Sequence, residues 1–116
     1  MRFLVLLTEE DHFTKWDEAG DDLRKRTIDD FNAFGDAVRA RGTLVVGDAL
    51  QPPASARRLG PGPERSVTRG PYAETVEQIG GFYLVDLPDL ETAVEIAALL
   101  PREYTVEVRP TLEITV

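Results

Sequence analysis

The sequence predicts a ferredoxin-like α+β fold, a split βαβ arrangement with a hairpin inserted between its two halves. Strand-like apolar runs and two helical patterns follow one another as strand, helix, strand, hairpin, strand, helix, strand. The stretch Gly60 to Glu64 alternates glycine and proline and predicts the hairpin tip. With 116 residues, of which 42% are hydrophobic, the chain fits a single domain over 1–116.

The first half of the chain is expected to form a strand, a long helix and a second strand. Phe3 to Leu7 is apolar without alternation, which predicts a strand covered on both faces. Residues 8–16 are polar and predict a loop. From residue 17 to 41 apolar residues recur at spacings of three and four, and acidic residues precede basic ones, as a helix prefers. Residues 43–49 form the second expected strand, which the Pro52-Pro53 pair ends.

The second half is expected to supply the hairpin and the rest of the split βαβ unit. Residues 54–59 and 65–68 flank the predicted tip, and residues 81–87 follow as an apolar strand. A short helix is expected after Pro88, with one apolar face made by Ala93, Ile96, Ala97 and Leu100. Residues 105–109 alternate in polarity and predict the final strand, which residues 111–116 either extend or follow.

Both faces of the predicted sheet are apolar, although two helices cover only one of them. Phe3, Val5 and Leu7 point to one side, and Leu4 and Leu6 to the other. An uncovered apolar face of this kind is unusual in a monomer. We therefore expect a homodimer that forms sheet to sheet and buries about 800 Å² per subunit. The less favoured alternative is that the hairpin folds back over this face.

Composition narrows the classes of partner. The net charge is −8, from 21 acidic and 13 basic residues, which disfavours nucleic acid and anionic membranes as partners. The chain has no cysteine, no signal peptide pattern and no segment of membrane-spanning length, so we expect a cytoplasmic location. It also lacks a phosphate loop, a zinc-ligand spacing and a dinucleotide fingerprint, and we expect no cofactor and no metal.

Two carboxylates are the candidate catalytic residues. Asp48 ends a predicted strand beside Gly47, where it would act as a base or orient a ligand; an equally weighted alternative is a turn acid bonded to the backbone. Glu74 and Glu77 lie three residues apart and would share a face if that segment were helical, holding a proton or a cation between them. The favoured alternative for this pair is ordinary surface acids.

Three further residues are candidates for ligand binding: Arg109, Tyr72 and Tyr83. Arg109 would anchor a substrate carboxylate, although pairing with Glu107 across a strand or a subunit boundary is the favoured interpretation. His12 follows three acids in sequence, but consecutive loop residues seldom converge on one ion, so a surface loop is expected. The glycine pair at 80–81 predicts a bulge or a close approach of strands.

The sequence resembles the YCII-related family, and within it the DGPF-type branch with its Asp-Gly-Pro-Phe signature followed by Glu. The matching residues are Arg69 to Tyr72 with Glu74, then Glu77-Gln78, Gly80 to Tyr83, Gly47 to Pro52 and Val106 to Pro110. The resemblance implies a dimeric α+β barrel of ferredoxin-like subunits. Members of this branch are often associated with extracytoplasmic-function sigma factors.

The chain departs from the branch signature at two positions, and this limits which residue roles the resemblance implies for it. Arg69 stands where the signature has Asp, and Tyr72 stands in place of Phe. The wider family is suspected of catalysis through a His-Asp pair. The only histidine here is His12, and no motif places it beside Asp48, so the pair is not transferred.

Two functions of different class follow. The first is a small-molecule-binding or regulatory module, because a cavity is expected and no recognisable catalytic set is present. The alternative is a cofactor-free enzyme that performs acid–base chemistry, of isomerase or lyase type, on a small organic substrate. Asp48 and Glu74 would then carry protons and Arg109 would anchor the substrate.

Overall fold

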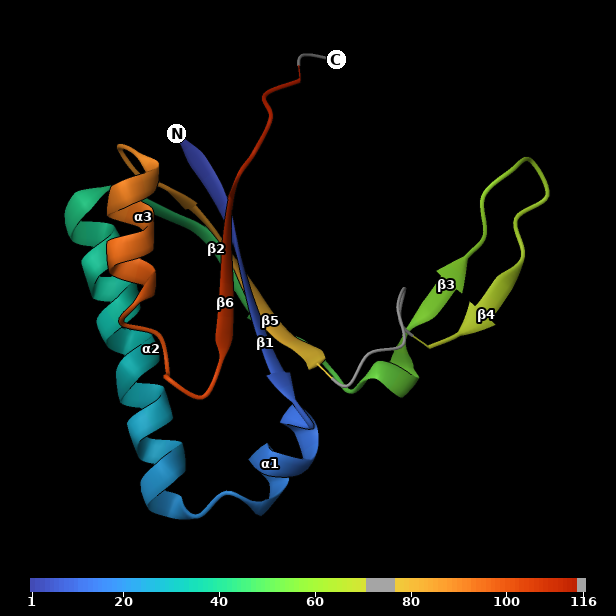
Figure 1. The fold of residues 1–116 in the computed structure, drawn as a ribbon, viewed down its shortest axis with the longest axis horizontal. Helices are drawn as coiled ribbons and strands as arrows, with labels where there is room; N and C mark the ends of the chain where they lie inside the picture. The colour runs from blue at the N-terminus through green and yellow to red at the C-terminus, as the bar shows by residue number, and fades with distance from the viewer. Residues whose placement is uncertain (71–76, 115–116) are drawn as a thin grey trace.

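Four antiparallel strands form the main sheet, in the order β2 (Thr43–Ala49), β5 (Glu77–Asp86), β1 (Arg2–Glu10), β6 (Thr105–Pro110) (Figure 1). The structure, a computed structural model, describes residues 1–70 and 77–114. The first strand lies at the centre of the sheet, between the strand that precedes the last helix and the strand that ends the fold. This is the strand order of a split βαβ unit, and it confirms the predicted ferredoxin-like fold.

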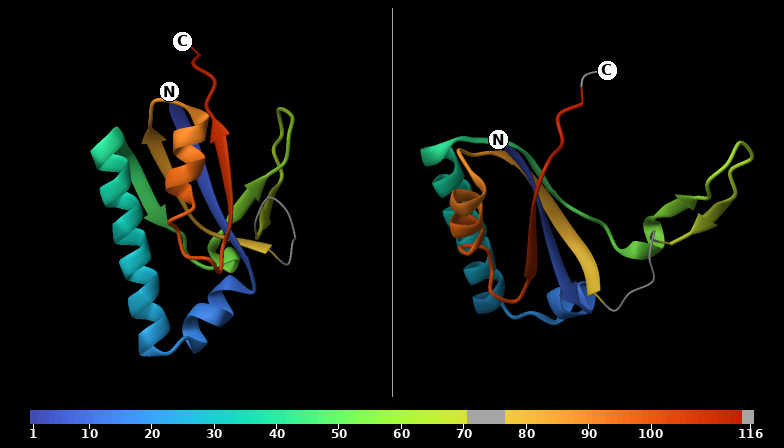
Figure 2. Two further views of the ribbon diagram at one scale, coloured as in Figure 1. Left: turned by 60° about the vertical axis from the view of Figure 1, so that its left-hand side comes forward. Right: turned by 45° about the horizontal axis from the view of Figure 1, so that its top comes forward.

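Two helices, α2 (Asp21–Arg41) and α3 (Leu90–Ala97), cover one face of the sheet (Figures 1 and 2). The core lies between them and the strands, and its residues come from β1, β5 and both helices and from the segments that adjoin them. Phe3, Val5, Phe34, Val38 and Val85 are at most 1% exposed. The predicted apolar face of α3 is confirmed, since Ala93, Ile96 and Ala97 are buried in this core together with Leu100 just after the helix.

The start of the chain differs from the prediction of a loop over residues 8–16. β1 continues to Glu10, and a short helix, α1 (His12–Glu18), follows at once. Asp11 makes the reversal possible because its φ of 51° lies in the left-handed region that Asp tolerates better than most residues. The backbone N–H of Phe13 donates to Gln78 Oε1 at 3.3 Å and ties α1 to β5. A helix of seven residues is too short to show a periodicity in sequence.

The sheet face opposite the helices is apolar, as the alternation of β1 predicts. Leu4 pairs with Leu84, and Leu6 with Phe82, and all four side chains are partly buried rather than enclosed. Val46, in register with Leu84 on the other side, is 39% exposed. No described helix lies over this face (Figure 2).

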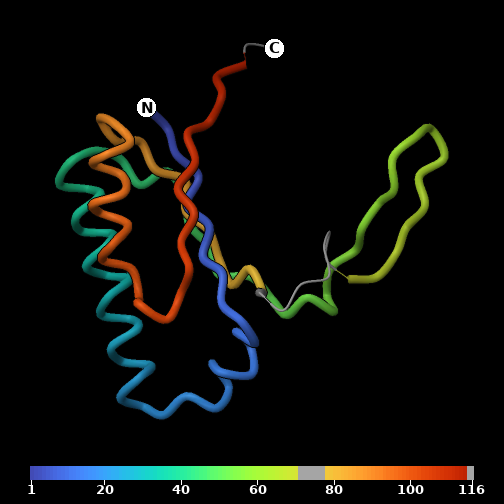
Figure 3. The backbone as a smooth tube through the Cα atoms, in the orientation of Figure 1, coloured from blue at the N-terminus to red at the C-terminus, as the bar shows by residue number. Residues whose placement is uncertain are grey.

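The inserted hairpin stands away from the sheet as an arm, which we define as residues 53–70. It contains a short 3-10 turn, η1 (Pro53–Ser55), and the strands β3 (Arg57–Leu59) and β4 (Val67–Arg69). Its base is closed by the N–H of Gly70, which donates to the carbonyl of Ala56 at 3.0 Å. The backbone trace places the arm on the side of the sheet away from the helices (Figure 3). The alternative in which the hairpin folds onto the open face is therefore not observed within the chain.

Residues 111–114 continue past β6 without forming a strand. In the described part of the chain, none of the helices combines the length and the apolar character needed to cross a bilayer.

Helix α3 begins with a side-chain cap that yields a first testable prediction. Asp89 Oδ1 accepts a hydrogen bond of 2.7 Å from the backbone N–H of Thr92, and this bond holds the pKa of Asp89 below its usual value. Because the folded pKa is lower than the unfolded one, the stabilisation is present above the unfolded pKa. It is lost as the pH falls through the folded pKa.

We expect Asp89→Ala to lower the melting temperature by a few degrees at neutral pH, with a difference from wild type that shrinks in acid. Thermal denaturation followed by circular dichroism at several pH values measures this effect. Asp89→Asn is the matched control, because it keeps an acceptor for the cap and removes the titration. A loss that does not change with pH would contradict the role of the carboxylate.

Candidate functional site

A cavity of about 540 Å³ lies at the end of the sheet from which the arm departs. Its walls come from β1, α1, α2, the end of β2 with the segment after it, the middle of β5 and the segment before β6. Most of the lining is apolar, and it includes six aromatic side chains: Phe13, Trp16, Phe31, Phe82, Tyr83 and Tyr104. The volume falls within the range that is typical of sites for small organic molecules.

His12 is buried in the wall of this cavity, which corrects the prediction of a surface loop. The residue is 8% exposed. Its Nδ1 lies 2.9 Å from Glu9 Oε2, and the Glu9 side chain is itself only 11% exposed. A carboxylate oxygen can only accept, so Nδ1 donates, and the neutral ring then carries its lone pair on Nε2. Lys15 Nζ lies 3.8 Å from the other oxygen of Glu9 and adds a positive charge to the pair.

The glycine pair makes room for this histidine. Gly80 lies where the pairing of β1 with β5 shifts register, between Leu7 and Thr8, so the predicted bulge is confirmed. A Cβ atom on Gly80 would lie 2.6 Å from His12 Nε2 and 2.7 Å from its Cδ2, inside van der Waals contact. Gly81 approaches Asp48 similarly, with a Cβ that would lie 3.0 Å from the Asp48 carbonyl oxygen. The pair therefore lets both the imidazole and strand β2 approach β5 closely.

Two tyrosines complete the aromatic wall. The ring of Tyr104 lies 5.4 Å from that of His12 and 6.0 Å from that of Phe31, and Tyr83 lies 4.7 Å from Phe34. Burial, with a smaller contribution from the charge of Glu9, raises the pKa of Tyr104 to about 12. Burial also raises the pKa of Tyr83. Both hydroxyls therefore stay protonated at neutral pH and can donate a hydrogen bond.

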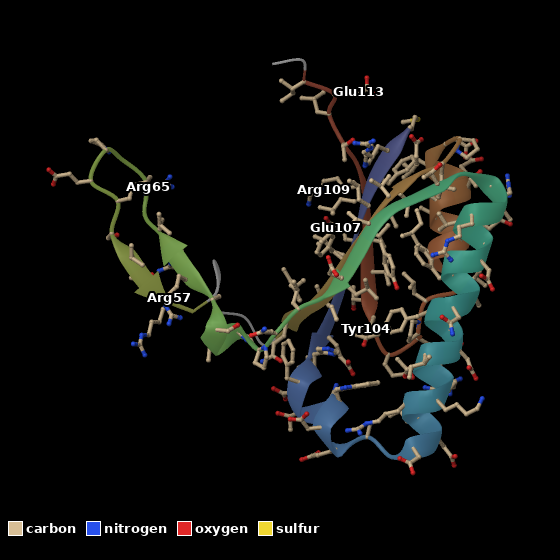
Figure 4. All side chains as sticks on the ribbon, turned by 180° about the vertical axis from the view of Figure 1, so that it is seen from behind. Arg57, Arg65, Tyr104, Glu107, Arg109 and Glu113 are labelled. Atoms are coloured by element: carbon tan, nitrogen blue, oxygen red, sulfur yellow. The ribbon has the colours of Figure 1, made fainter. Side chains whose placement is uncertain are left out.

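The predicted site residues are partly brought together. Asp48 and Tyr83 both line the cavity, and they share it with His12 although no motif links them. Arg109 does not line it: its Nη2 pairs with Glu107 Oε2 at 2.9 Å, the partner that the sequence favoured, within strand β6. Both side chains project on the side of the sheet that faces the arm, whereas Tyr104 lies on the helix side (Figure 4). Glu74 and Tyr72 lie outside the described residues.

Sequence reasoning missed the pairing of Glu9 with His12 and the place of Tyr104. The sequence shows that Glu9 and His12 are three residues apart. This spacing brings the two side chains together only because the backbone reverses direction at Asp11. Tyr104 comes from a short segment between α3 and β6 that has no periodic pattern. The usable signal was the glycine pair, because a missing side chain implies that something else occupies its space.

Apart from His12, the charged side chains in the described lining of the cavity are acidic. Besides His12 and the two tyrosines, the ionisable residues among its described lining are Asp17 and Asp48. No lysine or arginine belongs to that described lining, and the sequence of residues 71–76 contains none.

Comparison with known proteins agrees with the resemblance noted in the sequence. Residues 1–114 match the YCII-related domain. An uncharacterized protein from Rhizobium meliloti (strain 1021) is 33% identical over 116 aligned residues, which cover 95% of this chain and 91% of that protein. The chain therefore belongs to the YCII-related domain family.

Proposed function

We propose that the protein binds a small, planar organic molecule of neutral or positive charge in the cavity beside His12. The observation that carries this proposal is the lining itself, in which six aromatic rings surround a few polar groups. Sites for small molecules share this composition, since the apolar walls bind and the polar groups orient. Planar ligands suit it best, because aromatic pairs gain from offset and edge-to-face contacts.

The preference for a neutral or cationic ligand follows from the acidic side chains in the lining of the cavity. Asp17 and Asp48 repel a carboxylate and attract an ammonium group. The faces of aromatic rings attract a cation as well. The guanidinium of Arg24 already lies over the Trp16 ring, 5.3 Å from its centroid, so this attraction falls to the other aromatic rings of the lining. This preference differs from the expectation of a substrate carboxylate anchored by Arg109, because Arg109 is paired with Glu107 away from the cavity.

The fluorescence of Trp16, the sole tryptophan, tests both parts of the proposal. Phenethylamine, phenethyl alcohol and phenylacetate share one ring and differ in charge. We expect the amine to bind about tenfold more tightly than the acid, because the attraction of the rings and the carboxylates adds up to roughly 1–2 kcal/mol. Titrations of the three compounds measure the ratio.

Asp48→Asn should reduce this preference for the amine, whereas the matched variant Asp36→Asn should leave it unchanged. Asp36 is on α2, its side chain is 85% exposed, and it does not line the cavity. Tightest binding of the acid would contradict the charge argument. Failure of all three compounds, together with failure of larger aromatic amines, would contradict binding at this site.

A second function, acid–base catalysis, is favoured by the Glu9–His12 pair. Carboxylate-oriented histidines serve as general bases, since the carboxylate fixes the tautomer and stabilises the imidazolium that forms. Nε2 would take a proton from a bound substrate and return it at another atom, which is isomerase or lyase-type chemistry. The presence of Asp48 in the same cavity also supports a His-Asp site like the one suspected in the wider family.

For the assembly we propose a homodimer formed through the open face of the sheet. Leu4, Leu6, Phe82 and Leu84 would be buried in it, and the two sheets would together form an α+β barrel. A monomeric mass in sedimentation equilibrium at high concentration would contradict it. We also assign the chain to the DGPF-type branch, supported by Gly70-Pro71 followed by an aromatic residue and Glu74.

A further inference from the structure

The arm carries a charge opposite to that of the rest of the protein. Its residues include four arginines, Arg57, Arg58, Arg65 and Arg69, and one acid, Glu64, for a net charge of +3. Because the whole chain carries −8, the residues outside the arm carry −11. All four arginines are exposed, and the labelled Arg57 and Arg65 project from the arm (Figure 4).

One face of the arm carries two arginines opposite each other and two exposed apolar residues, a combination that is unfavourable in an isolated hairpin. In the register of β3 with β4, Arg57 lies opposite Arg69 and Leu59 opposite Val67. Alternation along the strands puts these four residues on one face and Arg58 and Thr68 on the other. Like charges directly opposite each other destabilise a strand pair. Leu59 and Val67 are 51% and 63% exposed, so this face offers apolar contact area next to a pair of positive charges.

The arm lies on the same side of the sheet as the open apolar face. All views place the arm on the side of the sheet away from α2 and α3 (Figures 1, 2 and 4). A second copy packed on the open face would therefore lie beside the arm. The surface of that copy is acidic overall, which complements the arm in charge.

From these observations we propose that the arm is a clasp for a second copy of the same chain. The face made by Arg57, Leu59, Val67 and Arg69 contacts the acidic body of the partner, and the exchange is reciprocal because a homodimer is symmetric. This inference rests on the homodimer proposed above and adds to it a specific contact surface outside the sheet.

Residues on the two opposite faces of the hairpin provide matched variants. Arg69→Glu and Val67→Asp alter the proposed contact face, whereas Arg58→Glu and Thr68→Asp introduce the same changes of charge on the other face. We expect each contact-face variant to raise the Kd of the dimer about tenfold or more, and each control to change it much less. Sedimentation velocity over a range of concentrations measures these constants. The Kd of the wild type should also rise with salt, because exposed charges are screened.

A second measurement keeps the arm face intact. The chain has no cysteine, so Glu64→Cys at the tip accepts a single benzophenone label. Irradiation is expected to join two chains, with the attachment point on the acidic body of the second chain. Mass spectrometry of the cross-linked peptides locates that point.

Each other outcome overturns the clasp in a distinguishable way. A monomeric wild type rejects both the clasp and the homodimer and leaves the ligand titrations untouched. A dimer that responds equally to changes on both faces of the arm, or that gives no cross-link, rejects the clasp alone. Tight binding of a labelled DNA duplex by the arm, lost in Arg69→Glu while the dimer is unaffected, assigns the arm to nucleic acid instead.

Discussion

Replacing Phe34 by alanine should lower the free energy of unfolding by about 3–5 kcal/mol, the range found for large aromatic residues in cores. Phe34 is 1% exposed on α2 and contacts Tyr83, with ring centroids 4.7 Å apart. The substitution removes buried apolar area and leaves a cavity that the helix and the sheet cannot close. Urea denaturation measures the change.

Leu112→Ala provides the control for this prediction, because Leu112 is 81% exposed and should change stability by less than about 0.5 kcal/mol. A loss of under about 1 kcal/mol for Phe34→Ala would mean that the core relaxes around the gap. Since Tyr83 lines the cavity, the same variant should also weaken ligand binding. That effect links the core to the site through one shared side chain.

Replacing His12 by glutamine should reduce catalysed proton exchange on a bound ligand by about 10²–10⁴-fold, the usual contribution of a general base. Glutamine keeps a polar group near Gly80 but cannot take a proton at neutral pH. Loss of deuterium from a labelled carbon acid, followed by NMR in water, measures the rate. Binding measured through Trp16 should change far less than the rate.

Glu9→Gln distinguishes a positioning role from a structural one. It keeps an oxygen that accepts from His12 Nδ1 and removes the charge that stabilises the imidazolium. We expect a smaller loss of rate than in His12→Gln, with ligand binding, followed through Trp16, close to that of the wild type. Equal exchange rates in wild type and His12→Gln would reject catalysis by this residue and leave the ligand proposal intact.

The large elements of the fold were predictable because their patterns are long. The 21 residues of α2 repeat their apolar spacing over several turns, and β1 alternates between two apolar faces. The sequence pattern predicts a helix that starts at Asp17, whereas α2 starts at Asp21, because α1 and α2 adjoin with only two residues between them. Their acidic residues read as one helix start in the sequence.

The site was less predictable because it depends on single contacts between distant segments. His12 reaches Gly80 across 68 positions only after β1 and β5 have paired with a shift in register. Asp48 lines the cavity, and its catalytic role stays a prediction that rests on a local pattern, a strand end beside glycine. Arg109 pairs with Glu107, and the choice between this partner and a ligand depends on which sheet face the helices cover.

Because the base of the arm is closed, the sequence of the arm can vary in evolution separately from that of the main sheet. The N–H of Gly70 donates to the carbonyl of Ala56 at 3.0 Å, so residues 56–70 form a hairpin that is closed by its own backbone hydrogen bonds. Insertions, deletions and changes of charge within this hairpin can occur without disturbing the strand pairing of the main sheet. If the arm binds the partner and the cavity binds the ligand, as we propose, the two specificities can diverge independently of each other.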